Sequence, residues 1–174
     1  GQSSVAVEIL AEHQLDAILV PVGGGGLLAG TALAARALRP ALSVIGVEVE
    51  NYASMSAGLQ NQPGHCGGAT IAEGIAVKKP GQLTLALARA LKLPVVTVSE
   101  ATIETAVALL VNIEKTVVEG AGAAGLAYLL GLPEALRGKK VGIVLSGGNI
   151  DSRILAAVLL RALGRQGRIT RLRI

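Results

Sequence analysis

Short apolar runs alternate with longer amphipathic segments along most of the chain. Runs of strand length, rich in valine, isoleucine and leucine, lie at 17–22, 43–48, 94–98 and 140–146. The longer segments are predicted helices and lie at 5–13, 27–38, 83–91, 102–115, 120–130 and 150–163. Wholly apolar runs are typical of strands buried on both faces of a parallel sheet. The pattern therefore predicts an α/β fold, in which a mostly parallel sheet of about four strands is covered by helices on both faces, in three αβα layers.

One segment, 51–77, is less regular than the rest of the chain. It is rich in glycine, alanine and small polar residues, and a long irregular stretch inside a compact domain is often functional. No repeat and no internal linker divides the remaining pattern. We predict one domain over 1–163, followed by a basic tail at 164–174.

Composition excludes several classes of protein. Of the 174 residues, 51% are hydrophobic and the mean hydropathy is +0.59, so the chain is not intrinsically disordered. A single cysteine excludes an internal disulfide framework, and no cysteine–histidine cluster could hold structural zinc. The aromatic side chains are Tyr52 and Tyr128, which leaves almost nothing on which bases could stack and argues against a nucleic-acid partner.

The net charge of +4 comes from the end of the chain. Five of the 16 basic residues lie in the last 14 positions, at Arg161, Arg165, Arg168, Arg171 and Arg173, and the rest is close to neutral. We interpret these arginines as a solvated helix end and linker, with a phosphate-binding arm as the alternative.

An uncharged stretch, 17–35, is long enough to cross the hydrocarbon core of a bilayer. Pro21 and the four glycines at 23–26 would break a continuous helix there, and the chain does not open with a signal-peptide layout. The sequence therefore favours a soluble, cytoplasmic protein with no membrane partner. Because it begins with Gly1 and not with methionine, we expect a fragment or a processed product.

The strongest local signal is the run Gly23, Gly24, Gly25 and Gly26, between a buried strand and the helix that starts near Leu27. Glycine permits positive φ and lets a ligand approach the backbone. The free amides and the dipole of the helix N-terminus attract an anion. One glycine would suffice for a turn, and four carry a substantial entropic cost. We therefore predict a phosphate-binding loop, and a flexible connection is the alternative.

The loop alone does not identify the phosphate ligand. Gly24, Gly26 and Ala29 satisfy the pattern G-x-G-x-x-A, and Glu48 follows at the end of a strand. Dinucleotide-binding domains place at that point the acidic residue that binds the ribose. No lysine of the Walker type follows the glycines, which excludes a P-loop nucleotidase.

A second glycine-containing loop, 144–149, also follows a strand and leads into a helix. In a parallel sheet, both loops would open at the edge where such folds bind ligands. Ser146 would then direct its hydroxyl into the pocket that the first loop supplies. Alternatively, Ser146 caps the helix that follows.

Four motifs occur in the order PVGGGGL (21–27), IAEGIAV (71–77), EGAGAA (119–124) and VLSGGN (144–149). Together they resemble the pyridoxal-phosphate enzymes of the tryptophan-synthase-β fold type (fold type II), and among these the threonine/serine dehydratases. Cysteine synthase-like relatives carry a threonine-bearing loop in place of the four glycines, so the dehydratase branch is favoured. The resemblance implies pyridoxal 5'-phosphate as cofactor, a small amino acid as substrate and a homo-oligomer.

The resemblance also implies roles for individual residues. The four glycines and the amide of Leu27 would hold the cofactor phosphate, and the hydroxyl of Ser146 would contact the pyridine nitrogen. A serine does not keep that nitrogen fully protonated as an aspartate would, which weakens the ring as an electron sink and favours loss of the β-hydroxyl. The backbone of Gly74 would lie beside cofactor and substrate. Glu119 would begin the segment under the ring, or be an ordinary helix N-terminal acid.

Glu48, together with Tyr52 and Ser54, matches a divalent-cation site found in some relatives. Those relatives have an aspartate at the third position, and Ser54 departs from that pattern. We therefore predict that Glu48 is a solvated carboxylate at the end of a strand, and the cation site is the alternative.

Two motifs of this family are absent from the chain. One is a Ser-x-Lys segment whose lysine forms a Schiff base with the cofactor, and the other is an S-x-G-N-H-type segment that binds the substrate carboxylate. The resemblance places both upstream of Gly1, so we expect the C-terminal portion of a catalytic domain, inactive by itself.

For the parent protein, the resemblance implies β-elimination of L-threonine, or of L-serine, to a 2-oxo acid and ammonia. Three alternatives remain. They are a serine racemase-like enzyme, a non-catalytic fragment or binding domain, and a dinucleotide-binding domain.

Overall fold

Four parallel strands form the central sheet of the computed structural model, which describes residues 2–64 and 66–170. The strands are β1 (Ala17–Pro21), β2 (Ser43–Val49), β3 (Val95–Val98) and β4 (Val141–Ile143), in the spatial order β3-β2-β1-β4. The inner strands β1 and β2 are buried along almost their whole length. Because all neighbouring pairs are parallel, the carboxyl ends of the strands meet at one edge of the sheet.

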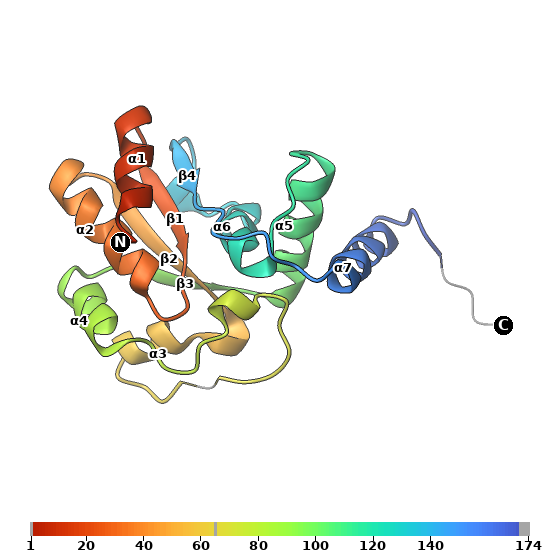
Figure 1. The fold of residues 1–174 in the computed structure, drawn as a ribbon, viewed down its shortest axis with the longest axis horizontal. Helices are drawn as coiled ribbons and strands as arrows, with labels where there is room; N and C mark the ends of the chain where they lie inside the picture. The colour runs from red at the N-terminus through yellow and green to blue at the C-terminus, as the bar shows by residue number, and fades with distance from the viewer. Residues whose placement is uncertain (1, 65, 171–174) are drawn as a thin grey trace.

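Helices cover both faces of this sheet, which confirms the predicted three-layer α/β fold (Figure 1). They are α1 (Ser4–Glu12), α2 (Gly26–Leu38), α3 (Ser54–Leu59), α4 (Gln82–Ala90), α5 (Glu100–Asn112), α6 (Gly120–Leu130) and α7 (Ser152–Arg165). Short 3-10 helices are η1 (Glu50–Tyr52), η2 (Glu73–Ile75) and η3 (Glu134–Leu136). In Figure 1, α1, α2 and α4 lie on one side of the sheet, α5 and α6 lie on the other, and α7 packs on α5.

The two faces have separate cores because successive side chains of a strand point to opposite faces. Ile18 and Val20 of β1 belong to the cluster under α2 and α4, whereas Leu19 belongs to the cluster under α5 and α6. Helix α6 approaches its face closely: a Cβ at Gly125 would lie 3.3 Å from Leu19 Cβ and would collide with Ile143. Glycine at this position lets the helix lie directly against the sheet.

The clearest differences from the sequence prediction are at α3 and β4. Helix α3 lies in the segment 51–77, where no helix was expected, because a carboxylate of β2 binds its first amides. Strand β4 ends at Ile143 and not at 146, because it pairs with β1 only as far as Leu19. Beyond that point the amide of Glu119 binds the Gly147 carbonyl (3.1 Å) and draws the chain toward α6.

Helix α7 is fastened by an ion-pair cluster. Glu104 of α5 is 8% exposed; its Oε1 lies 2.6 Å from Arg161 Nη2 and its Oε2 lies 2.9 Å from Arg165 Nη2. Burial disfavours the charged carboxylate, but the hydrogen bonds from both arginines hold the pKa of Glu104 below its usual value. These two arginines therefore do more than end a solvated helix. Arg171 and Arg173 lie outside the described residues.

The uncharged stretch 17–35 is divided between β1 and α2. Pro21 is the last residue of β1, and the glycines at 23–25 separate the strand from the helix. Within the ranges 2–64 and 66–170, no helix is both long and apolar enough to cross a membrane.

Candidate functional site

A cavity of about 270 Å³ lies at the carboxyl end of β1, where the chain enters α2. Its lining residues are Gln2, Pro21, Gly23, Gly24, Gly25, Gly26, Leu27, Gly74, Ile75, Glu119, Ala121 and Ser146. Every residue for which the resemblance to pyridoxal-phosphate enzymes implied a place at the cofactor lines this one cavity. The fold thus brings together the glycine loop, the turn at η2 and the loop after β4, which are far apart in the sequence.

The glycine loop, residues 23–26, presents backbone and no side chain to the cavity. Gly25 is the N-cap residue of α2 and has a φ of +88°. A Cβ at Gly25 would also collide with Met55 Cε and lie 2.9 Å from Thr84 Oγ1, so both conformation and space require glycine. A Cβ at Gly24 would meet no protein atom within 4 Å. That side of the loop is open to a ligand.

The amides of this loop are available for binding. Among the described residues, those of Gly24, Gly25, Gly26 and Leu27 donate to no protein carbonyl, whereas the Ala29 amide closes the first helical turn on the Gly25 carbonyl (2.9 Å). The dipole of α2 adds positive potential at the same point. Because no cationic side chain from residues 2–64 or 66–170 lines this cavity, an anion in it would be held by oriented amides.

Ser146 lies in the loop between β4 and α7 and is exposed at the edge of the cavity. It does not cap a helix, because α7 begins at Ser152 and its N-cap is Asp151, whose carboxylate accepts from the Arg153 amide (2.8 Å). The alternative role of Ser146 as an N-cap was therefore wrong. The Ser146 hydroxyl lies at the edge of the cavity, in a loop that is held by the hydrogen bond from the Glu119 amide to the Gly147 carbonyl.

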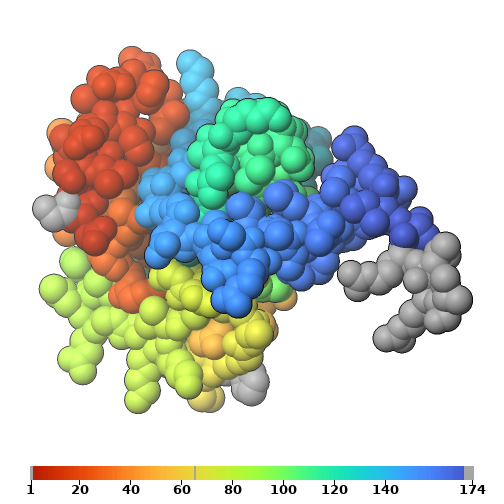
Figure 2. Space-filling view, turned by 45° about the vertical axis from the view of Figure 1, so that its right-hand side comes forward, coloured from red at the N-terminus to blue at the C-terminus, as the bar shows by residue number. Residues whose placement is uncertain are grey.

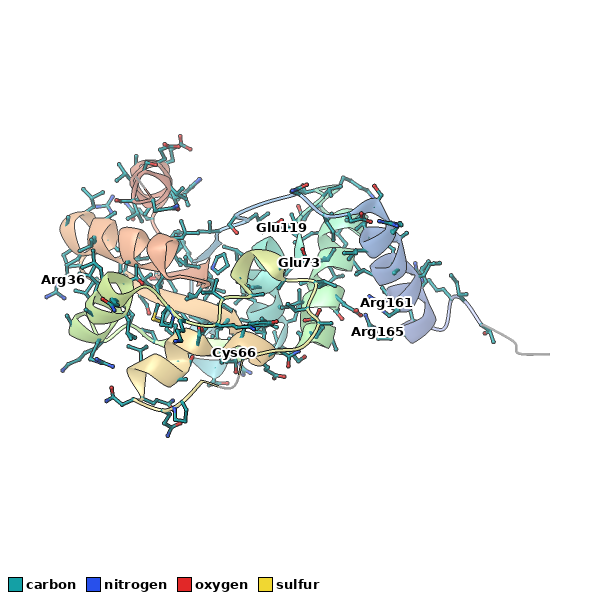
Figure 3. All side chains as sticks on the ribbon, turned by 60° about the horizontal axis from the view of Figure 1, so that its bottom comes forward. Arg36, Cys66, Glu73, Glu119, Arg161 and Arg165 are labelled. Carbon is teal, nitrogen blue, oxygen red and sulfur yellow. The ribbon has the colours of Figure 1, made fainter. Side chains whose placement is uncertain are left out.

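Glu119 and Gly74 separate the first cavity from a second and larger one of about 670 Å³. Glu119 is the N-cap residue of α6, but its side chain makes no capping hydrogen bond. A Cβ at Gly74 would lie 3.3 Å from Glu119 Oε1, so the carboxylate stands directly beside the η2 turn. Figure 3 shows Glu119 and Glu73 as near neighbours at this border.

The second cavity also contains charged groups that the sequence did not assign to a ligand site. Its remaining lining residues are Ile71, Glu73, Asn149, Ile150, Asp151, Arg153 and Ile154. In Figure 2 the blue segment that leads into α7 lies against the yellow segment around η2. Glu73 could have been found from its place in the motif IAEGIAV, but nothing local to Arg153 indicated that it would face that motif.

Glu48 lines neither cavity and is fully buried. Its Oε1 accepts from the Met55 amide (2.6 Å), and its Oε2 accepts from the Ser56 amide (2.9 Å) and the Ser56 hydroxyl (2.6 Å). Burial raises the pKa of Glu48, and these hydrogen bonds oppose the shift. The prediction of a solvated strand-end carboxylate was wrong, because Glu48 turns inward to bind the first amides of α3. With both oxygens engaged, it is not free to bind a ribose.

The other two positions of the implied cation site have different surroundings. Tyr52 Oη donates to the Gly68 carbonyl (2.8 Å), and the buried Ser54 Oγ has no hydrogen-bond partner among the described residues. Within residues 2–64 and 66–170, no group of three or more His, Cys, Asp or Glu side chains could hold a metal ion. A cation at Glu48 stays a prediction of the sequence, and the contacts observed give Glu48 a structural role.

Comparison with known proteins connects this site to a family. The family described as "Pyridoxal-phosphate dependent enzyme" matches residues 1–147. The L-threonine ammonia-lyase of Thermotoga maritima is 41% identical over 171 residues, which are 97% of this chain and 42% of that protein. The L-threonine ammonia-lyase of Geobacter sulfurreducens is 43% identical over 180 residues, covering 100% of this chain and 44% of the relative. The chain thus spans about half the length of these curated relatives.

Solved structures show the same fold. The processed form of threonine deaminase isoform 2 from Solanum lycopersicum matches with a TM-score of 0.83 and 30% identity, over 93% of this chain and 49% of that one. Serine racemase from Dictyostelium discoideum matches with a TM-score of 0.76 and 33% identity, over 87% and 50% of the two chains. The relatives therefore include both ammonia-lyases and racemases.

The residues present fit the phosphate of pyridoxal phosphate, the cofactor of this family. The loop offers unpaired amides at a helix N-terminus, and at Gly24 it leaves open space where any other residue would place a Cβ. Ser146 lines the same cavity and brings a hydroxyl to it. No lysine lines either cavity within the part of the chain that the structure describes.

Proposed function

Because the chain belongs to the pyridoxal-phosphate-dependent enzyme family, we propose that it forms the phosphate- and ring-binding part of a threonine ammonia-lyase. One observation carries the proposal: the glycine loop, Gly74 and Ser146 line a single cavity at the carboxyl edge of the sheet. The reaction is the conversion of L-threonine to 2-oxobutanoate and ammonia.

Bound pyridoxal phosphate supplies an aromatic ring that takes up the charge left on Cα when the α proton is removed. The residues of this chain would bind and orient that ring. The loop amides and the α2 dipole would hold the phosphate dianion, and the Ser146 hydroxyl would bind the ring nitrogen. Because a serine hydroxyl is neutral, it does not stabilise a protonated nitrogen as a carboxylate would.

Gly74 and Glu119 would shape the side of the ring that faces the substrate. Without a side chain at Gly74, the backbone of η2 can lie against a flat ligand. Glu119 stands where the two cavities meet, so its carboxylate lies within reach of groups in either one. The second cavity, which is larger, is the place we assign to the amino-acid substrate.

The proposal assigns the lysine that binds the cofactor covalently to a part of the protein outside these 174 residues. Reduction of the cofactor-loaded protein with borohydride, followed by peptide mass spectrometry, tests this. A phosphopyridoxyl group on a lysine of this chain would contradict the assignment.

The activity is tested on the complete protein that contains this chain, saturated with pyridoxal phosphate. We expect 2-oxobutanoate and ammonia in equal amounts from L-threonine. A protein that binds the cofactor but forms no 2-oxobutanoate would overturn the assignment. L-serine, offered in parallel, shows whether the shorter β-hydroxy amino acid is also a substrate.

Serine racemase activity is the second candidate, because the matching structures include a serine racemase at 33% identity. Chiral separation of the amino acid left after incubation with L-serine distinguishes the two. Accumulation of D-serine without a 2-oxo acid would favour the racemase. The buried position of Glu48 disfavours the dinucleotide alternative, and thermal unfolding with either NAD or pyridoxal phosphate tests it.

A further inference from the structure

We propose that Thr84 is a positioning residue for the glycine loop: it fixes the direction of the Gly25 amide and so determines how strongly the site prefers a phosphorylated ligand. The inference rests on the proposed function, because it takes the cavity beside the loop as the phosphate site. It concerns a contact between segments that are 60 residues apart in the sequence.

Thr84 lies in the first turn of α4, and its hydroxyl Oγ1 is 2.6 Å from the carbonyl oxygen of Gly24. The amide of Gly81, the N-cap residue of α4, donates to the same oxygen (3.1 Å). Thr84 Oγ1 also lies 2.9 Å from the Gly81 carbonyl. Because a hydroxyl has one proton, the shorter contact identifies Gly24 as its main acceptor. The Gly24 carbonyl is thus held by two donors from the start of α4.

These contacts determine where the next amide points. In a trans peptide the C=O and the following N–H lie in one plane and point in opposite directions, and the described residues contain no cis peptide. With the Gly24 carbonyl directed at α4, the Gly25 N–H points away from α4. Gly24 and Gly25 both line the cavity. Met55 and Thr84 pack against Gly25 and leave no room for a Cβ there. The Gly25 amide is therefore directed at the cavity.

A run of four glycines would otherwise have great freedom. Each glycine reaches both signs of φ at little cost, so the peptide between Gly24 and Gly25 could turn over and direct its carbonyl oxygen at the cavity. An oxygen in that place would repel a phosphate dianion. Holding the carbonyl at Thr84 removes that conformation before the ligand arrives, which lowers the entropic cost of binding.

The experiment compares two probes, pyridoxal phosphate and pyridoxal, on the complete protein freed of cofactor. Binding of each is measured by calorimetry for the wild type, Thr84→Val and Thr84→Ser. Valine keeps the branched shape and removes the hydroxyl, whereas serine keeps the hydroxyl. Thr105→Val is the matched control, because Thr105 Oγ1 also donates to a backbone carbonyl, that of Ala101 (2.9 Å), in a helix away from the cavity.

We expect Thr84→Val to bind pyridoxal phosphate about three- to tenfold more weakly, the effect of one lost hydrogen bond. Its affinity for pyridoxal should not change, and Thr84→Ser and Thr105→Val should match the wild type with both probes. An unchanged affinity ratio in Thr84→Val, or an equal loss in Thr84→Ser, would overturn the inference.

Two further outcomes are also informative. If Thr84 had a purely structural role, Thr84→Val would bind both probes more weakly by the same factor and would have a lower melting temperature. That result counts against a positioning role. A wild type that does not prefer the phosphorylated probe contradicts the proposed function itself, so the two failures are distinguishable. If Thr84→Val does not fold, Thr84→Ala carries the same comparison.

Discussion

Two loops meet at the carboxyl edge of the sheet, and they are built in opposite ways. The loop after β1 offers only backbone, and Met55 and Thr84 pack against it so closely that Gly25 cannot bear a side chain. The loop after β4 offers the exposed hydroxyl of Ser146 and is held to α6 by the bond from Glu119 to Gly147. In the proposed function, phosphate binding would thus depend on the absence of side chains in the first loop, and contact with the cofactor ring would depend on the one side chain that the second loop offers.

The largest expected effect is that of Gly25→Ala. Alanine at this position would have to adopt a φ of +88°, and its methyl group would collide with Met55. We therefore expect the free energy of unfolding to fall by about 2–4 kcal/mol. Affinity for pyridoxal phosphate should fall by at least about a hundredfold, because the loop must move to admit the methyl group. Denaturant unfolding and calorimetry measure the two effects.

Gly164→Ala is the matched control for that change. Gly164 lies inside α7, and a Cβ there would meet no atom within 4 Å. We expect this variant to be neutral or stabilised by up to about 1 kcal/mol. Equal losses of stability and of cofactor affinity in Gly25→Ala and Gly164→Ala would show that the loop does not require glycine at position 25.

Glu48→Gln tests the support beneath the loop. The amide NH2 group cannot accept the bonds that one carboxylate oxygen now accepts, so a donor of Met55 or Ser56 loses its partner. We expect a loss of about 1–3 kcal/mol of stability and a smaller loss of cofactor affinity than in Gly25→Ala. Glu50→Gln is the control, because Glu50 is exposed on the neighbouring turn. An unchanged melting temperature in Glu48→Gln would show that α3 does not need this cap.

Ser146→Ala should lower catalysis and leave the stability of the fold unchanged. The side chain is exposed and caps no helix, so the melting temperature of the cofactor-free protein should stay within the error of measurement. We expect kcat for threonine to fall by about tenfold, because one hydrogen bond to the ring is lost. Unchanged kcat would remove Ser146 from the site, and lower stability without the cofactor would give it a structural role.

Glu104→Gln gives the smallest effect and tests whether the ion pairs between α5 and α7 stabilise the fold. The lowered pKa of Glu104 means that its ion pairs contribute stability above its ordinary pKa of about 4.5 and lose it as the pH falls through the folded-state value. We expect the variant to be about 1 kcal/mol less stable at pH 7, a modest figure because both arginines are half exposed. The difference should shrink in acid, and a difference independent of pH would contradict the ion-pair explanation.

Features encoded locally were predictable from the sequence. The run of four glycines follows a wholly apolar strand, and both patterns lie within ten residues of each other, so the glycine loop between β1 and α2 could be placed without a structure. Ser146, Gly74 and Glu119 were found through motifs, and the structure brings all three to the loop's cavity. Their individual roles are proposals, and Ser146→Ala tests that of Ser146.

Features that depend on distant contacts were not predictable. Glu48 has the spacing of a ribose ligand and the position of a solvated strand end, yet it is buried because α3 offers it two amides. Thr84 follows an ordinary Gly-Gln-Leu sequence, and its contact with Gly24 exists only because α4 packs against α2. The cluster at Glu104 likewise needed α7 to fold back on α5.

Hydrophobic periodicity and glycine content act over a few residues, so the layers, the order of the strands and of every helix except α3, and the place of the glycine loop followed from the sequence alone. Which groups face one another became visible only in three dimensions: the inward turn of Glu48, the support of the loop by Met55 and Thr84, and the shared cavity of Gly74 and Ser146. A hydrogen bond or a steric collision depends on distances of a few ångströms between segments, and the separation of those segments in the sequence carries no such information.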